Sequence, residues 1–292
     1  MPRRLAAVIV AAILATLASA QVPAAERVTF AHATNAAEIT GYLQVPDGTG
    51  PFPAAVFLHG CSGLGSQGRI FSTYEAWADH LNGAGYAVLM VDSAGSRDLG
   101  RTCGPGEGRT RMYRERPGDA YGALAYLQSR PDIDPARVSL VGWSQGGGIA
   151  LLSIVAQSIG RPSPPPEHDF NVAVAFYPAA CSITRQSKPY TQVDQGTWAP
   201  VAPLLVLQGG ADNWTPPVRC VLFIDTVRAR GHPVEIVVYP GAYHAFDAPA
   251  MPVRERTGVT MHDGNHPIVG TDEAAREDAL ARVLDFLNAA AP

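Results

Sequence analysis

One feature of this chain of 292 residues limits its possible folds more than any other: short apolar runs alternate with longer stretches of helical spacing. Strand and helix segments in that alternation are typical of an α/β fold, in which helices cover both faces of a mostly parallel sheet. We expect eight strands, over residues 28–33, 39–45, 54–58, 87–91, 138–141, 173–176, 204–207 and 234–238. The first two form an antiparallel lead-in. We expect helices that begin near Tyr74, Pro117, Gln145, Arg219 and Asp272.

The first 20 residues have the order of a secretory signal peptide. Two arginines precede an uncharged apolar run over residues 5–17, and the small residues 18–20 precede Gln21. The run is shorter than the ~20 residues that a bilayer-spanning helix needs, so we expect no permanent membrane anchor. We therefore predict export by the general route, to the periplasm or the medium, and a single catalytic domain over residues 21–292.

The charge of the chain argues against one class of partner. The formal net charge is −4, and loss of Arg3 and Arg4 with the signal peptide would make it about −6. No later stretch gathers Lys and Arg densely enough to follow a phosphate backbone. We therefore expect a small-molecule substrate and no nucleic-acid partner, and the sequence leaves the oligomeric state open.

Four cysteines form an even set in a chain that we expect to reach an oxidising compartment, which favours disulfides. They are Cys61, Cys103, Cys181 and Cys220, and the sequence alone leaves three pairings open. None belongs to a Cys-x-x-Cys pair. His262 and His266 flank a polar loop without a third ligand nearby, so we predict no metal and no other cofactor.

The strongest local signal is a Gly-x-Ser-x-Gly motif around Ser144, set between the expected strand 138–141 and the helix from Gln145. Such a turn holds the serine in a strained conformation, and the flanking Gly142 and Gly146 permit close approach of strand and helix. The alternative is an ordinary structural turn in a chain with 29 glycines. The setting favours a nucleophile elbow with Ser144 as the nucleophile.

A serine hydroxyl needs a histidine to take its proton and a carboxylate to orient that histidine. His244 follows the last expected strand, and Asp212 follows the strand before it, which is the chain order Ser, acid, His. The alternatives are a packed loop histidine and a turn aspartate before Pro216. Asp247 is the reserve candidate for the acid because it lies three residues from His244.

Acyl transfer also requires N–H donors for the oxyanion. We assign the amides of Gln145 and Cys61, which follow the serine and the third expected strand respectively. The alternative for His59 and Gly60, in the loop after the third expected strand, is a tight turn. A thiol nucleophile at Cys61 is disfavoured because it lacks an elbow.

Several aromatic residues at strand ends are candidate pocket walls, although such residues often belong to the core instead. These are Trp143, Tyr177, Trp214 and Tyr243.

The chain resembles the dienelactone hydrolase family of the α/β-hydrolase superfamily over most of residues 27–290. The resemblance is carried by the ordered elbow, acid and His-Ala-Phe segments, and by segments 39–48 and 119–124. It implies an α/β-hydrolase fold. Ser144 and Gly60 stand where dienelactone hydrolases proper carry a cysteine and an acidic residue, so the arrangement looks more like that of an ordinary esterase.

The resemblance has further implications. Arg97 falls near a family arginine that holds the substrate carboxylate, with a loop salt bridge as the alternative. The usual hydrolase strand order implies the disulfides Cys61–Cys103 and Cys181–Cys220.

We therefore expect an exported serine hydrolase that cleaves ester or lactone bonds. The alternatives are a serine peptidase of prolyl-oligopeptidase type, for whose extra domain this chain has no room, and an inactive hydrolase scaffold that acts as a binding protein.

Overall fold

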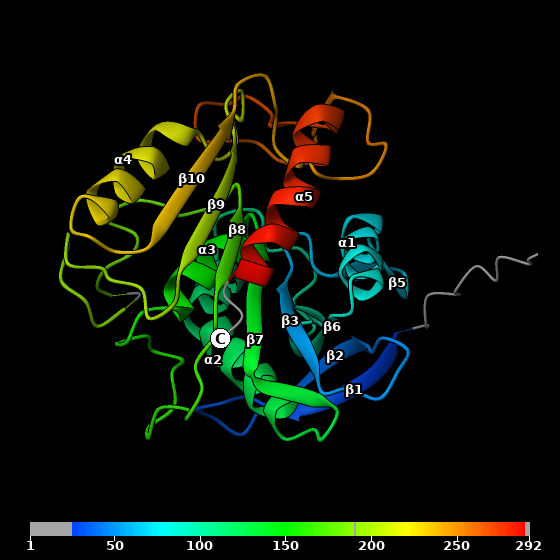
Figure 1. The fold of residues 1–292 in the computed structure, drawn as a ribbon. Helices are drawn as coiled ribbons and strands as arrows, with labels where there is room; N and C mark the ends of the chain where they lie inside the picture. Colours follow the sequence, from blue (N-terminus) through cyan, green and yellow to red (C-terminus); the bar gives the residue numbers. More distant parts are fainter. Residues whose placement is uncertain (1–24, 190, 290–292) are drawn as a thin grey trace, which may run out of the picture.

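A computed structural model describes residues 25–189 and 191–289, and its centre is one eight-stranded sheet (Figure 1). The predicted signal peptide, residues 1–20, lies outside the described residues. The strands of the sheet are β1 (Glu26–Ala31), β2 (Glu38–Gln44), β3 (Phe52–Leu58), β6 (Ala87–Val91), β7 (Ile133–Trp143), β8 (Ala173–Phe176), β9 (Leu204–Gly209) and β10 (Val234–Tyr239). All eight predicted strands are therefore confirmed.

The strand order is β1-β2-β6-β3-β7-β8-β9-β10. The six strands from β6 to β10 in this order run parallel to one another. Within this sheet the antiparallel pairs are those of β2, with β1 on one side and β6 on the other, which confirms the predicted lead-in. Two short hairpins and a 3₁₀ turn were not predicted. They are β4 (Gly65–Ser66) with β5 (Arg69–Ile70), β11 (Arg254–Glu255) with β12 (Ile268–Val269), and η1 (Gly95–Arg97).

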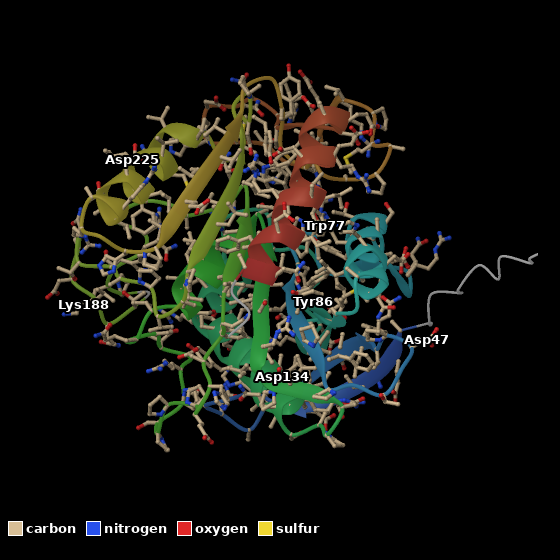
Figure 2. The ribbon with its side chains drawn as sticks, viewed as in Figure 1. Asp47, Trp77, Tyr86, Asp134, Lys188 and Asp225 are labelled. Carbon is tan, nitrogen blue, oxygen red and sulfur yellow. A yellow bond between two sulfur atoms is a disulfide. The ribbon has the colours of Figure 1, made fainter. Side chains whose placement is uncertain are left out.

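Helices cover both faces of the sheet. They are α1 (Ser72–Gly83), α2 (Glu107–Gln128), α3 (Gln145–Ser153), α4 (Pro217–Arg228) and α5 (Glu273–Ala289). Buried side chains of α2, α3 and α4 share one core with the sheet, and those of α1 and α5 share a second core on the other face. Trp77 of α1 lies in this second core, where its ring packs 5.0 Å from that of Phe176 (Figure 2). Among the described residues, no helix combines the length and hydropathy that crossing a membrane requires.

The helix expected to begin near Pro117 begins ten residues earlier, at Glu107, so that boundary was wrong. Proline in a helix interior removes a hydrogen bond and usually marks a boundary. Here tertiary contacts outweigh that signal. Tyr113 and Arg116 in the first half of α2 are buried, and Glu115 pairs with Arg111 on the same helix.

The strands β7, β8 and β9 end at one edge of the sheet, as parallel neighbours do. Their last residues are fully or almost fully buried on both faces, which is characteristic of a covered parallel sheet. The segments that follow them carry Ser144, Tyr177 and Asp212. Ligand sites in open α/β folds lie at this carboxyl edge.

Candidate active site

Ser144 occupies a strained turn between β7 and α3. Its backbone φ is +52°, a region that a residue with a side chain rarely adopts. The flanking glycines make the turn possible. A Cβ on Gly146 would lie 1.9 Å from the carbonyl oxygen of Leu58, and one on Gly142 would lie 2.3 Å from that of Gly146. The strand and the helix therefore approach too closely for any side chain at these positions.

A chain of two hydrogen bonds connects Ser144, His244 and Asp212. The Nε2 atom of His244 lies 3.0 Å from the Ser144 Oγ atom, and its Nδ1 atom lies 2.7 Å from the Asp212 Oδ2 atom. All three side chains are buried, and Ser144 keeps 9% of its surface exposed. The histidine can accept a proton from the serine while the carboxylate holds the ring.

The carboxylate of Asp212 is held by the turn that follows it. The amides of Trp214 and Thr215 donate to Oδ1 at 2.8 and 2.9 Å, and the Thr215 hydroxyl is 2.7 Å from Oδ2. Burial acts to raise the pKa of Asp212, but the charge and hydrogen bond of His244, together with the backbone and side-chain hydrogen bonds of Thr215, outweigh it and hold this pKa below its usual value. Thr215 was not among the predicted site residues, although an Asp followed three residues later by Thr-Pro is a recognisable turn pattern.

The imidazole of His244 lies between two aromatic rings. The Tyr177 ring centroid is 4.3 Å from that of His244, and the Trp214 centroid is 4.7 Å away. The guanidinium of Arg256 lies 5.3 Å from the Trp214 ring centroid. These contacts fix the plane of the imidazole.

Asp247, the reserve candidate for the acid, bonds to other groups. Its fully buried carboxylate accepts hydrogen bonds from the indoles of Trp77 and Trp143, at 2.8 and 2.7 Å, and from the Tyr177 hydroxyl at 2.7 Å. Burial raises the pKa of Asp247. The structure thus places Asp212, and not Asp247, against His244.

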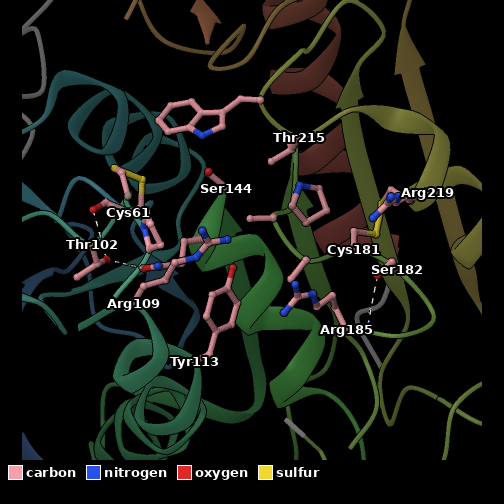
Figure 3. Close-up of a pocket in the computed structure, with 18 of the residues that line it drawn as sticks. Cys61, Thr102, Arg109, Tyr113, Ser144, Cys181, Ser182, Arg185, Thr215 and Arg219 are labelled. Carbon is pink, nitrogen blue, oxygen red and sulfur yellow. Dashed lines mark hydrogen bonds between the residues drawn. A yellow bond between two sulfur atoms is a disulfide. The ribbon is translucent and has the colours of Figure 1, made fainter. Parts of the chain in front are cut away.

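A cavity of about 450 Å³ opens over Ser144 (Figure 3). Cys61 and Gln145, whose amides we assigned to the oxyanion, both line it with Trp214. Three arginines also line it, and no Asp or Glu is among the described residues that do so. They are Arg109, Arg185 and Arg219. The cavity thus presents positive charge to a bound molecule.

Both disulfides implied by the hydrolase strand order are present. Cys61 bonds to Cys103 and Cys181 bonds to Cys220, and all four cysteines line the cavity. β3 is adjacent to β6, and β8 is adjacent to β9, so the segments after these strands, which carry each pair, emerge side by side, with Cys220 on α4. Each disulfide therefore closes one wall of the cavity.

The structure does not bring every candidate residue to the cavity. Arg97 forms a buried ion pair with Asp119 through two hydrogen bonds of 2.7 and 2.9 Å and a further pair with Glu115. It therefore occupies the salt bridge that was the alternative to a substrate contact. Its guanidinium also donates a hydrogen bond of 2.9 Å to the carbonyl oxygen of Ser93, so its partners lie on α2 and just before η1.

The aromatic candidates also divide. Trp143 and Tyr177 are buried and donate hydrogen bonds to Asp247, and neither is among the residues that line the cavity. Tyr243 is half-buried and is not among the residues that line the cavity. Trp214 is the aromatic candidate that lines it. Within the described part of the chain, no three His, Cys, Asp or Glu side chains come close enough together to hold a metal ion.

Comparison with known families decides the relationship that the motifs suggested. The model described as "Dienelactone hydrolase family" matches residues 39–291, which is most of the chain. The chain belongs to the dienelactone hydrolase family. As a member of it, the chain is a hydrolase with an α/β-hydrolase fold, and Ser144 occupies the elbow position.

Individual relatives of this family member are distant. A protein of Methylorubrum extorquens, whose name assigns it provisionally to the carboxymethylenebutenolidases, is 27% identical over 223 residues, which is 73% of this chain and 70% of that protein. Human dipeptidyl peptidase 8 is 26% identical over 219 residues, which is 68% of this chain and 23% of the peptidase. The chain spans only 23% to 38% of the length of the first curated relatives that it matches.

A solved structure shares the fold. Esterase 2 of Thermogutta terrifontis, in its form phosphoramylated by tabun, superposes with a TM-score of 0.62 over 92% of this chain and 96% of the esterase, at 19% identity. At that identity the likeness concerns the fold alone.

Proposed function

We propose that this chain is a serine hydrolase that cleaves carboxylic ester or lactone bonds through an acyl-enzyme. The observation that carries the proposal is the unbroken chain of hydrogen bonds from the Ser144 hydroxyl through His244 to Asp212, at a strained elbow beside a cavity. A packed loop histidine would not need a serine on one nitrogen and a supported carboxylate on the other.

In the proposed cycle, the Ser144 Oγ atom attacks the substrate carbonyl while His244 Nε2 takes its proton. The amides of Cys61 and Gln145 meet the negative charge on the carbonyl oxygen. His244 returns the proton to the leaving alcohol, which departs and leaves an acyl group on Ser144. A water molecule, deprotonated by His244, then hydrolyses this acyl-enzyme, and Asp212 stabilises the imidazolium in both halves.

The lining of the cavity supports a small-molecule ester with an anionic group. Arg109, Arg185 and Arg219 reach the cavity from α2, from the loop after β8 and from α4. Guanidinium groups bind carboxylates well because their donors match the geometry of the two oxygens. The rest of the wall is largely apolar or neutral, so the remainder of the substrate needs no charge.

We also propose that residues 21–292 form one catalytic domain and that the protein is exported. The membership of all eight main strands in one sheet supports the first point. Two disulfides in the described part of the chain support the second, because disulfides persist in oxidising compartments. The signal-peptide pattern of residues 1–20 agrees with both.

A peptidase is the second candidate function, favoured by the similarity to dipeptidyl peptidase 8 over 68% of this chain. The arginines that line the cavity support the esterase, since a small ester with an anionic group would meet positive charge there. Amide substrates such as dipeptide anilides should therefore be cleaved far more slowly than matched esters. Faster cleavage of the anilides than of the matched esters would favour the peptidase.

A fluorophosphonate probe tests the proposed function. We expect it to label the wild-type protein, and we expect Ser144→Ala to abolish both labelling and ester hydrolysis, with a loss of kcat of about 10⁶-fold. Ser182→Ala is the matched control, because Ser182 lines the same cavity without a histidine partner in the described structure. An unlabelled, inactive wild type would support the inactive binding scaffold instead.

A further inference from the structure

Arg116 on α2 is a fully buried cation beside the candidate active site. Its Nη2 atom donates a hydrogen bond of 2.8 Å to the carbonyl oxygen of His59, and its Nη1 atom donates one of 3.2 Å to the side-chain oxygen of Gln145. Both acceptors are neutral. The guanidinium therefore contacts the two segments that carry the proposed oxyanion donors.

The burial of this charge is not compensated by an ion pair. In the described structure no carboxylate pairs with Arg116, and Asp119, one turn further along α2, is held through both oxygens by Arg97. The Nε atom of Arg116 has no hydrogen-bond partner among the described residues. An unpaired buried charge destabilises a fold, so its presence calls for a physical reason.

The guanidinium remains charged in the pH range where a hydrolase works. Burial lowers the pKa of Arg116 to about 10, an effect only partly offset by the charge of Asp119. At neutral pH a full positive charge is therefore hydrogen-bonded to the two segments that carry the proposed oxyanion amides.

The contacts of Arg116 continue to both oxyanion segments. Gln145 Oε1 also accepts a hydrogen bond of 3.1 Å from the Thr102 hydroxyl. The Thr102 amide in turn donates a hydrogen bond of 2.7 Å to the carbonyl oxygen of Cys61. The carbonyl of His59 lies two residues before Cys61. Arg116 and Thr102 thus both connect the loop after β3 to the start of α3.

We propose that Arg116 is a positioning residue for the oxyanion hole, which holds the backbone amides of Cys61 and Gln145 in place through His59 and the Gln145 side chain. This inference rests on the proposed function. A fixed charge and fixed donors stabilise the transition state more than the bound ester, because the negative charge exists only in the former. Loss of Arg116 should therefore lower kcat and leave KM nearly unchanged.

The test compares two variants. Arg116→Met fills the space without charge, and Arg116→Lys keeps the charge but loses the two-pronged guanidinium that contacts both His59 and Gln145. For a p-nitrophenyl ester, we expect Arg116→Met to lower kcat by about tenfold to a hundredfold, with KM changed by less than about threefold. Arg116→Lys should recover part of kcat. Arg111→Gln is the matched control, since Arg111 is exposed on the same helix, and it should behave as the wild type.

A boronic acid inhibitor gives a second readout, because it forms a tetrahedral, anionic adduct on a reactive serine. If Arg116 positions the oxyanion hole, the inhibition constant should rise in Arg116→Met by about the same factor as kcat falls. A purely structural role would reduce the folded fraction and leave the inhibition constant of the folded protein unchanged. That result, or a kcat within about threefold of wild type, would overturn the inference.

If Arg116→Met does not fold, Thr102→Val provides the test, since it removes the second donor to Gln145 without exposing the guanidinium. We expect a smaller fall in kcat, again with a matching rise in the boronate inhibition constant. An unchanged kcat in a folded Thr102→Val protein would overturn the inference. An active wild type with unaffected variants rejects the role of Arg116 alone, whereas a wild type that no fluorophosphonate labels rejects the proposed function itself.

Discussion

The Tyr177 hydroxyl donates a hydrogen bond of 2.7 Å to the fully buried carboxylate of Asp247. The ring of the same tyrosine packs 4.3 Å from that of His244. The carboxylate also accepts from Trp143, the residue directly before Ser144. One buried acid therefore connects the turn that presents the serine with the ring that supports the histidine.

We predict that Asp247→Asn destabilises the protein by about 1–3 kcal/mol, because the neutral amide keeps one acceptor oxygen in place of two and its hydrogen bonds lose the charge of the carboxylate. Urea unfolding would measure the loss. Tyr177→Phe removes one of the three hydrogen bonds and should cost less. A stability of Asp247→Asn equal to that of wild type would contradict the proposed role of this carboxylate.

The lowered pKa of Asp212 predicts an acid-dependent stability. A carboxyl whose pKa is lower in the folded state stabilises the fold above its ordinary pKa of 3.8, and this contribution is lost as the pH falls through the lowered value. Asp212→Asn lacks the contribution at every pH. The wild type should therefore unfold at a higher temperature than the variant at pH 6, and the gap should shrink as the pH falls below 3.8. A gap that stays constant down to pH 2 would contradict this prediction.

The arginines of the cavity predict a preference for anionic esters. Arg219→Gln should raise KM for a p-nitrophenyl hemisuccinate by about fivefold, which corresponds to ~1 kcal/mol for a partly exposed ion pair, and leave KM for a p-nitrophenyl butyrate unchanged. Added salt should reduce the difference. Arg228→Gln, on the same helix but outside the cavity, is the control. Equal effects on both esters would argue against anion recognition by Arg219.

The disulfide Cys181–Cys220 joins the loop after β8 to α4 across 39 residues. Its removal in the double variant Cys181→Ala and Cys220→Ala should lower the free energy of unfolding by about 2–4 kcal/mol, because the unfolded chain gains freedom. Urea unfolding with and without a thiol reductant measures the effect. The variant should be less sensitive to the reductant than the wild type, and equal sensitivity would contradict a stabilising role for this bond.

Much of the fold and part of the candidate site could be predicted from the sequence. The strand segments follow from local patterns, since buried parallel strands are continuous apolar runs. Their order across the sheet was implied by the family resemblance and not by the local patterns. The positions of Ser144, Asp212 and His244 are also local signals, because each residue follows a strand in a turn of recognisable chemistry. The structure brings these three side chains into hydrogen-bond contact.

The rest depends on which segments meet. Pro117 indicated a helix boundary, but packing carries α2 through it. Arg97 follows a Gly-Ser pair and Arg116 precedes a proline, but neither context shows that Arg97 pairs with Asp119 or that Arg116 is buried beside Gln145. The periodicity of the sequence does not show these partners, because each lies about 20 or 30 residues away and meets the arginine only when the chain folds.

The sequence by itself thus determined the α/β order, the serine at its elbow and the acid and histidine after later strands, since each depends on the backbone chemistry of a few adjacent residues. Only the tertiary structure decided between Asp212 and Asp247 as the acid that contacts His244. It also decided which arginines line the cavity and that Arg116 contacts the two segments with the proposed oxyanion amides. These depend on burial and on distances between segments far apart in the chain, and local chemistry carries no record of either.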